Sequence, residues 1–153
     1  MKEKKFQFIE KPKDSLLSLI IANRPTCYAE LIKLAARFEF LHGNCDSEDE
    51  LTQDLEKRDQ RSDTRIFEDF ALPHCETKYV DHSDLIFIDC SKKICKWFYG
   101  DSVKGVFFII LKSNESLENK KRIQRYVTKL ANYQTILKLY GLNSLEDLEK
   151  MLN

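Results

Sequence analysis

Val103-Lys104-Gly105-Val106-Phe107-Phe108-Ile109-Ile110-Leu111 is the most hydrophobic stretch of this 153-residue chain. Its β-branched and aromatic residues form a nearly continuous apolar run, which is typical of a strand inside a sheet that is covered on both faces. Upstream, Asp84 to Cys90 has the same character and predicts another strand. Helices must cover such a sheet, so we expect helices in the neighbouring segments.

Helical patterns follow the central strand. Apolar residues recur at helical spacing over residues 117–130, 133–140 and 145–152, and Asn143 or Ser144 offers an N-cap for the last segment. These segments predict helices that cover the sheet.

The first third of the chain predicts one strand and two helices. The apolar run of residues 16–21 is consistent with a core strand. Thr26 offers an N-cap for a helix over residues 28–41, which Gly43 can end. A second helix is predicted over about residues 46–58, because acidic residues favour its N-terminal end.

The order of elements predicts an α/β fold: a three-layer sandwich in which a mixed β-sheet is flanked by helices on both faces. We expect one domain over residues 1–153. Residues 1–14 are either a loose arm or a short edge strand, residues 59–69 a loop, and residues 94–99 a hairpin arm or edge strand.

Composition excludes several classes of protein. Lys+Arg and Asp+Glu both count 25, so no net field would hold the chain on nucleic acid or on an anionic membrane. The sequence lacks an apolar stretch of about 20 residues and an N-terminal signal pattern, which predicts a cytoplasmic protein without direct membrane insertion. The five cysteines contain no Cys-x-x-Cys pair, and we expect no disulfides.

Phe70-Ala71-Leu72-Pro73-His74-Cys75-Glu76 is the first candidate for chemistry. The apolar residues predict the end of a buried strand, and Pro73 is expected to stop regular pairing because it has no backbone N–H. His74 then lies just past the strand, where an imidazole can act as base, nucleophile or ligand. Most histidines at strand ends do no chemistry, so this heptapeptide alone does not decide the question.

Other chemical readings have less support. A metal site would use His74, His82, Cys75 or Cys45, but these residues lack the spacing of a zinc site, so we expect no metal and no cofactor. Cys75 as a protease nucleophile has no supporting local signature. The sequence has no glycine-rich phosphate loop, so any phosphate that the protein handles must arrive already activated.

A basic stripe on the predicted helix over residues 117–130 raises the possibility of nucleic-acid binding. Lys121, Arg125 and Lys129 share this stripe, and Tyr126 could stack on a base. A solvated charged face is the favoured interpretation, since the net charge is balanced and aromatic residues are sparse. No nucleic-acid partner is therefore expected.

Two residues upstream of His74 are suited to binding an oxyanion. Arg58 offers a guanidinium fork at the end of the second predicted helix, and Thr64 offers a hydroxyl in the following loop. Either residue alone is weak evidence for such a site, because arginines at helix ends usually complement the helix dipole and threonines in loops usually cap turns.

Arg58, Asp59, Thr64 and Phe70-Ala71-Leu72-Pro73-His74 together resemble the Arg-Glu, Thr and Ile-Ala-Ile-Pro-His pattern of fructose/mannitol-type (type 2) enzyme IIA domains. These domains belong to the bacterial phosphoenolpyruvate-dependent sugar phosphotransferase system (PTS). Pro73-His74-Cys75-Glu76 is most similar to the galactitol-specific branch. The resemblance covers about residues 15–139, and only residues 58–76 are specific.

The resemblance implies a cytoplasmic phosphocarrier. His74 would accept a phosphoryl group from the carrier protein HPr, becoming a tele-phosphohistidine, and pass it to a IIB component that serves the IIC membrane permease. Arg58 and Thr64 would stabilise the phosphate, with Lys120, Cys75 and Glu76 as possible accessory residues. Transfer between histidines needs positioning and charge stabilisation and no metal.

The chain also departs from the family pattern. Many relatives carry glycines where this chain has Arg65, Phe67 and Asp69, so we expect a bulkier and less compact loop beside the histidine. A second histidine of many relatives is replaced here by Lys120 or a neighbour. These departures keep two alternatives open: a regulatory enzyme IIA-like domain that signals through a protein partner, and a degenerate domain without phosphate transfer.

Overall fold

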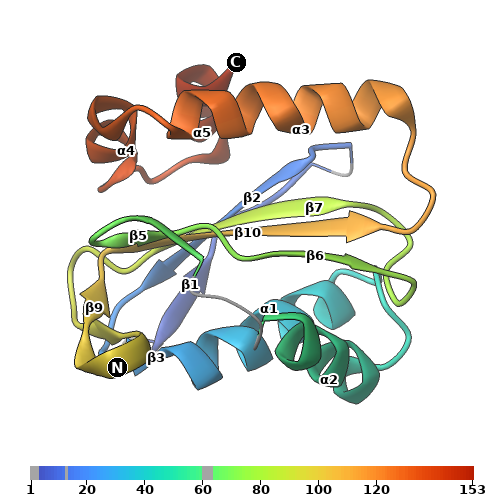
Figure 1. Ribbon diagram of the computed structural model, residues 1–153, viewed down its shortest axis with the longest axis horizontal. Helices are drawn as coiled ribbons and strands as arrows, with labels where there is room; N and C mark the ends of the chain where they lie inside the picture. The colour runs from blue at the N-terminus through green and yellow to red at the C-terminus, as the bar shows by residue number, and fades with distance from the viewer. Residues whose placement is uncertain (1–3, 13, 60–63) are drawn as a thin grey trace.

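The computed structural model describes residues 4–12, 14–59 and 64–153, without the side chains of Arg58, Asp59 and Tyr99. Its main sheet lies between two helical layers, with α1 and α2 on one face and α3, α4 and α5 on the other (Figure 1). The predicted three-layer α/β sandwich with a mixed sheet is confirmed. The main-sheet strands are β1 (Phe6–Phe8), β2 (Leu17–Ala22), β4 (Arg65–Phe67), β5 (Phe70–Ala71), β6 (His74–Thr77), β7 (Asp84–Asp89) and β10 (Gly105–Lys112). The helices are α1 (Tyr28–Leu41), α2 (Glu48–Asp59), α3 (Leu117–Leu130), α4 (Tyr133–Leu139) and α5 (Leu145–Leu152).

Strand β10 occupies the middle of the sheet, as its hydrophobicity predicts. The strand order is β1-β2-β7-β10-β5-β4, and β6 also pairs with β10. Antiparallel pairing joins β10 to β7, whereas parallel pairing joins it to β5 and β6. Residues Val106 to Ile110 of β10 are all buried, because side chains on both faces meet a helical layer.

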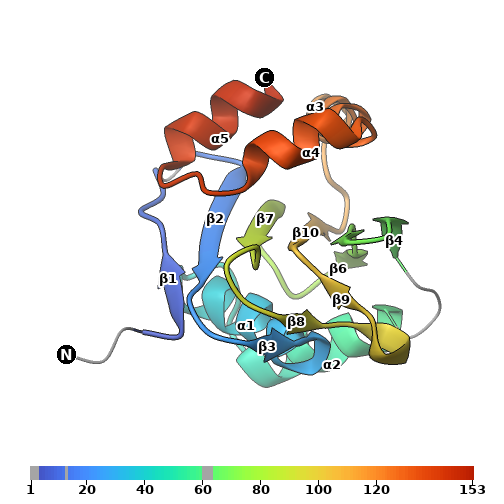
Figure 2. The same ribbon diagram turned by 90° about the vertical axis from the view of Figure 1, so that its left-hand side faces the viewer.

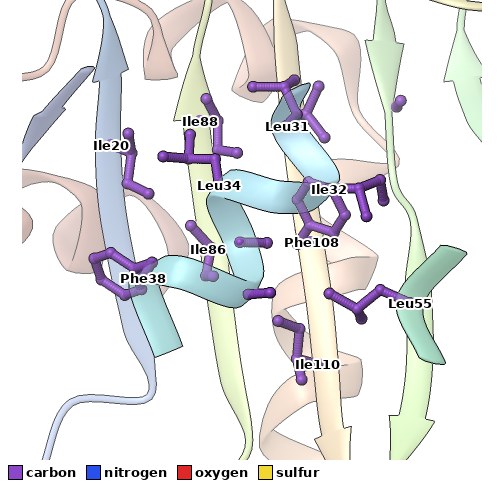
Figure 3. Close-up of a cluster of buried hydrophobic side chains, with 14 of the residues drawn as sticks. Ile20, Leu31, Ile32, Leu34, Phe38, Leu55, Ile86, Ile88, Phe108 and Ile110 are labelled. Carbon is purple, nitrogen blue, oxygen red and sulfur yellow. The ribbon is translucent and has the colours of Figure 1, made fainter. Parts of the chain in front are cut away.

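Helix α1 packs on one face of the sheet through an apolar stripe (Figure 3). Its side chains meet those of β2, β7 and β10, and Leu55 of α2 extends the contact. The labelled residues of this core are Ile20, Leu31, Ile32, Leu34, Phe38, Leu55, Ile86, Ile88, Phe108 and Ile110. The predicted stop at Gly43 is confirmed by its positive φ of 70°, which suits glycine.

The predicted N-cap at Thr26 is wrong. Cys27 takes the N-cap position of α1 without a side-chain hydrogen bond, while Thr26 lies in the short strand β3 (Thr26–Cys27). The Thr26 hydroxyl instead donates to the carboxylate of Glu30 at 2.5 Å. Thr26 therefore pairs in a strand, although the local sequence pattern predicts it to be the helix cap.

The C-terminal helices form the second core with the opposite sheet face. Ser116 caps α3 and Ser144 caps α5, each accepting a backbone N–H, so Ser144 rather than Asn143 is the cap. Tyr126 of α3 is 2% exposed and donates to the side chain of Asn153. It cannot stack on a nucleic-acid base, whereas Lys121, Arg125 and Lys129 are exposed as a solvated stripe requires.

Three segments acquire more structure than their sequences suggest. Residues 6–8 form the edge strand β1, so the second of the two interpretations of the N-terminal segment is confirmed. Part of the expected loop over residues 59–69 forms β4, which pairs with β5. Within residues 94–99, β8 (Cys95–Lys96) pairs with β3 and β9 (Ser102–Val103) in a small second sheet, seen beside α1 in Figure 2.

Gly105 provides a test of this packing. A Cβ atom at Gly105 would lie 2.9 Å from Cε2 of the buried Phe70 and 3.0 Å from Cε1 of Tyr140. We expect Gly105→Ala to lower the free energy of unfolding by about 1–3 kcal/mol, because neither ring can move without disturbing the core. Urea denaturation measures the change, with the exposed Lys104→Ala as control. Equal stability of Gly105→Ala and wild type would show that this contact relaxes freely.

Candidate functional site

His74 lies at the start of β6, and not beyond the end of a strand as predicted. Pairing with β10 runs through β5, pauses at Leu72 and Pro73, and resumes when His74 takes the register position of Ile109. Pro73 lacks an N–H, but its carbonyl oxygen still accepts the Ile109 N–H at 2.9 Å. The backbone on both sides of the histidine is therefore fixed to the central strand.

The strand alternation determines which face carries the imidazole. His74 and Glu76 are exposed, whereas Cys75 between them is 9% exposed and belongs to the core under α1 and α2. Ile109, the register partner of His74, belongs to the core under α3 to α5. His74 and Glu76 therefore share the α3 side of the sheet, and Cys75 points to the other side.

Among the residues that the structure describes, a backbone carbonyl oxygen lies near the imidazole of His74. Nδ1 of His74 lies 3.5 Å from the carbonyl oxygen of Leu72, which is long for a hydrogen bond. In the tautomer that donates from Nδ1 to this oxygen, the lone pair is on Nε2 of the exposed imidazole.

Thr64 is tied to the same short segment. Its carbonyl oxygen accepts the Leu72 N–H at 2.9 Å, so Leu72 links Thr64 to the backbone that precedes His74. The Thr64 hydroxyl is buried and has no hydrogen-bond partner within residues 4–12, 14–59 and 64–153. A buried hydroxyl without a partner is uncommon and suits a site that receives an acceptor from outside.

The other predicted site residues are placed differently. Arg58 belongs to α2, a helix that packs against β6, but its side chain lies outside the described part. Lys120 is exposed in the first turn of α3, and no bond from it to His74 is found among the described residues. His82 and Cys45 lie apart from His74, on the loop before β7 and between α1 and α2. The described residues contain no group of three metal-binding side chains.

The segment before β5 is more ordered than the expected loop. Arg65 in β4 forms an ion pair with Asp101 at 2.7 Å, and the Tyr133 hydroxyl donates to Asp69 at 2.9 Å. The non-glycine residues beside the site thus build a paired strand anchored to two other segments, and not a less compact path.

Most of the chain matches a known protein family. Residues 19–153 match the family described as "Phosphoenolpyruvate-dependent sugar phosphotransferase system, EIIA 2". The chain belongs to this family. A comparison with curated proteins gave no match.

Solved structures share the fold of this EIIA type 2 domain. IIA mannitol from Escherichia coli has a TM-score of 0.61 and 19% identity, covering 82% of this chain and 88% of that one. The complex of IIA mannitol with phosphorylated IIB mannitol from the same organism has a TM-score of 0.61 and 18% identity, covering 83% and 88%. Nitrogen regulatory protein IIA-Ntr from Neisseria meningitidis has a TM-score of 0.64 and 15% identity, covering 85% of this chain and 92% of that one.

No helix in the described ranges is long and apolar enough to cross a membrane.

Proposed function

We propose that this domain is a cytoplasmic phosphocarrier that accepts a phosphoryl group from HPr on His74 and passes it to a IIB component. The observation that carries the proposal is the exposed imidazole at the start of β6, whose neighbouring backbone is fixed to β10 and to Thr64. Family membership supports the reaction class, a phosphotransferase system, and the exposure of His74 on its anchored strand supports its choice as the acceptor. The proposed phosphocarrier is a single domain over residues 1–153.

The proposed transfer needs only positioning and charge stabilisation. Nε2 of His74 attacks the phosphorus of phospho-HPr in line with the leaving imidazole nitrogen, so one P–N bond forms as another breaks. The weak contact between Nδ1 and Leu72 supports attack by Nε2, because it assigns the proton to the other nitrogen. Arg58 and the Thr64 hydroxyl would stabilise the equatorial oxygens, with neither metal nor cofactor.

Lys120 and Glu76 are proposed in lesser roles. Lys120, on the exposed first turn of α3, would attract phosphate over a distance, while Glu76 shares the face of His74 and would contact a docking protein. Cys75 is not proposed to touch the phosphoryl group, since its side chain belongs to the opposite core.

The partner class follows from the same reaction. IIA mannitol, which has this fold, is known in a complex with phosphorylated IIB mannitol, and a IIB protein is the proposed recipient here, with a IIC permease beyond it. Residues 73–76 resemble the galactitol branch most, so a galactitol-type IIB is the first to test.

A regulatory role is the second candidate. The ordered β4 segment, held by Arg65 and Asp101, replaces the glycine-containing loop of many relatives and changes the surface near the histidine. The fold is also similar to that of the nitrogen regulatory protein IIA-Ntr. In this alternative, phosphorylated His74 alters the affinity for a protein partner and does not supply sugar transport.

Phosphate transfer through purified components tests the proposal. The protein is incubated with enzyme I, HPr and labelled phosphoenolpyruvate, and then with candidate IIB proteins. HPr-dependent, acid-labile label that moves on to a IIB protein is the expected result. Label that no IIB protein removes would favour regulation, and absence of label with active HPr would contradict both roles.

Replacing the Thr64 hydroxyl provides a graded test. We expect Thr64→Val to slow phosphate acceptance about tenfold, because a hydrogen bond to a charged group contributes roughly 1.5 kcal/mol. Thr64→Ser, which keeps the hydroxyl, serves as the matched control. Quenched-flow transfer from phospho-HPr measures both rates, and equal rates for the valine and serine variants would remove Thr64 from the site.

A further inference from the structure

The N-terminal arm, defined as residues 4–12, lies along the edge of the sheet and precedes the family match, which begins at residue 19. Its strand β1 pairs antiparallel with β2, and the Ile9 N–H donates to the Leu19 carbonyl oxygen at 3.0 Å. Figure 2 shows β1 at the outer edge of the sheet beside β2. The arm therefore covers a strand edge that would otherwise be unpaired.

Lys11 anchors the far end of this arm. Its ammonium group donates to Ser18 Oγ and to Asp84 Oδ1, both at 2.8 Å, and the Ser18 hydroxyl donates to the same Asp84 oxygen at 2.7 Å. The side chains of Lys11 and Asp84 are only 14% and 3% exposed. This ion pair is thus largely shielded from solvent, unlike the arm's other pair, Lys5 with Glu30, whose side chains are 38% and 35% exposed.

Glu39 of α1 lines the same pocket as this ion pair and interacts with Asp84 and Lys11. It is 1% exposed, and its Oε2 accepts a hydrogen bond from the Asn44 amide. Its Oε1 is buried and has no hydrogen-bond partner in the described ranges when both carboxyl groups are taken as acceptors. Burial, together with the neighbouring Asp84 charge, raises the pKa of Glu39 to about 10.

A proton on Glu39 explains the unpartnered oxygen. As a neutral acid, Glu39 can donate one hydrogen bond to Asp84, the carboxyl group that it interacts with. The Asp84 Oδ1 atom already accepts from Lys11 and Ser18. Asn44 cannot donate a hydrogen bond to Glu39 Oε1, because its amide N–H groups already donate to Glu39 Oε2 and to the His82 carbonyl oxygen. One proton thus joins two buried carboxyl groups beside one ammonium group.

The surrounding groups line a pocket of about 400 Å³ between the arm, α1 and the start of β7. The arm contributes Lys11, and the segment after it contributes Asp14 and Ser15. Helix α1 and the turn after it contribute Glu39, His42 and Asn44, and the β7 side contributes His82, Ser83 and Asp84. Lys11 brings a positive charge to the lining of this pocket, and its ammonium group contacts Asp84.

We propose that Lys11, Asp84 and a protonated Glu39 form a latch that holds the N-terminal arm closed over the β2 edge. The ammonium group neutralises the buried Asp84 carboxylate, and the Glu39 proton prevents a second negative charge beside it. Loss of Lys11 leaves a buried carboxylate without its cation, so the arm opens while the helical layers remain packed. The latch is independent of His74, which lies on the other face of the sheet.

Hydrogen exchange tests the arm directly. In the full chain, we expect Lys11→Met to speed exchange of the Ile9 amide and the β1 amides at least tenfold, with β10 amides unchanged. Lys5→Met, which removes the more exposed ion pair of the same arm, is the matched control and is expected to change these rates less than threefold. Equal effects of the two substitutions, or acceleration throughout β10, would overturn the latch.

Proton release on unfolding tests the Glu39 proton separately. Because the folded state holds this proton up to about pH 10 and the unfolded carboxyl loses it near pH 4.5, unfolding releases one proton between these limits. The contribution of this proton to the free energy of unfolding is therefore complete below pH 4.5 and declines as the pH rises toward 10. Glu39→Gln can keep both hydrogen bonds but carries no titratable proton. Between pH 5.5 and 8.5, we expect the free energy of unfolding of this variant to lose the pH dependence that corresponds to the release of one proton. An unchanged pH dependence would show that Glu39 holds no extra proton.

Discussion

His74→Ala is expected to abolish phosphate acceptance from phospho-HPr, with the label falling to the level of a reaction without the domain. The imidazole is the proposed nucleophile, and no neighbouring side chain can replace it: Cys75 belongs to the opposite core and Glu76 would form a far less suitable acyl phosphate. The loss is expected without unfolding, because the side chain is exposed and the strand is held by its backbone.

The controls for His74 separate chemistry from folding. Thermal unfolding and circular dichroism of His74→Ala should match wild type, since exposed substitutions rarely change stability by more than about 0.5 kcal/mol. Changing either of the other histidines, with His42→Ala or His82→Ala, should leave acceptance intact. HPr-dependent label retained by His74→Ala would assign the phosphoryl group to another residue.

Arg58→Ala is expected to slow transfer on the order of 10²-fold, because removing one preorganised donor from a developing oxyanion costs about that factor. Arg58 is carried by α2, which packs against the strand of His74, and we propose its role because the interval of sixteen positions between Arg58 and His74 resembles the family pattern. Arg58→Lys keeps the charge and loses the guanidinium fork, so an intermediate rate is expected.

Single-turnover transfer from phospho-HPr measures the effect of Arg58 without the later step to IIB. Lys57→Ala, a change in the adjacent exposed helix residue, is the matched control and should transfer at the wild-type rate. An unchanged rate for Arg58→Ala would mean that the arginine acts only on the helix dipole.

The sequence predicts most of the fold because its strongest signals are local. The apolar run in β10 predicts a strand covered on both faces, and the helical spacing of α1 predicts a helix with one buried stripe. Both are found where predicted. The cap of α5 is Ser144, one of the two candidates with Asn143, because no other element competes for it. Thr26 is not a cap, because pairing with β8 takes this residue into a strand.

The site was predicted less completely than the fold. Pro73 was expected to end the strand, but it removes only one donor, and the parallel ladder to β10 continues through its carbonyl oxygen. The latch around Asp84 was missed altogether, since Lys11 and Asp84 lie 73 positions apart and no local pattern joins them. Thr64 is predicted as a motif residue, whereas the burial of its hydroxyl, without a hydrogen-bond partner in the described part of the chain, is a property of the fold alone.

The position of the phosphoryl group on the labelled protein tests the central claim most directly. The domain is phosphorylated through enzyme I and HPr, and phosphorus-31 NMR at alkaline pH, with peptide mapping of the same sample, identifies the modified atom. The account predicts a single phosphohistidine at His74, substituted on Nε2. A phosphoryl group on Nδ1 would contradict the proposed orientation, and one on any other residue would contradict the assignment of His74.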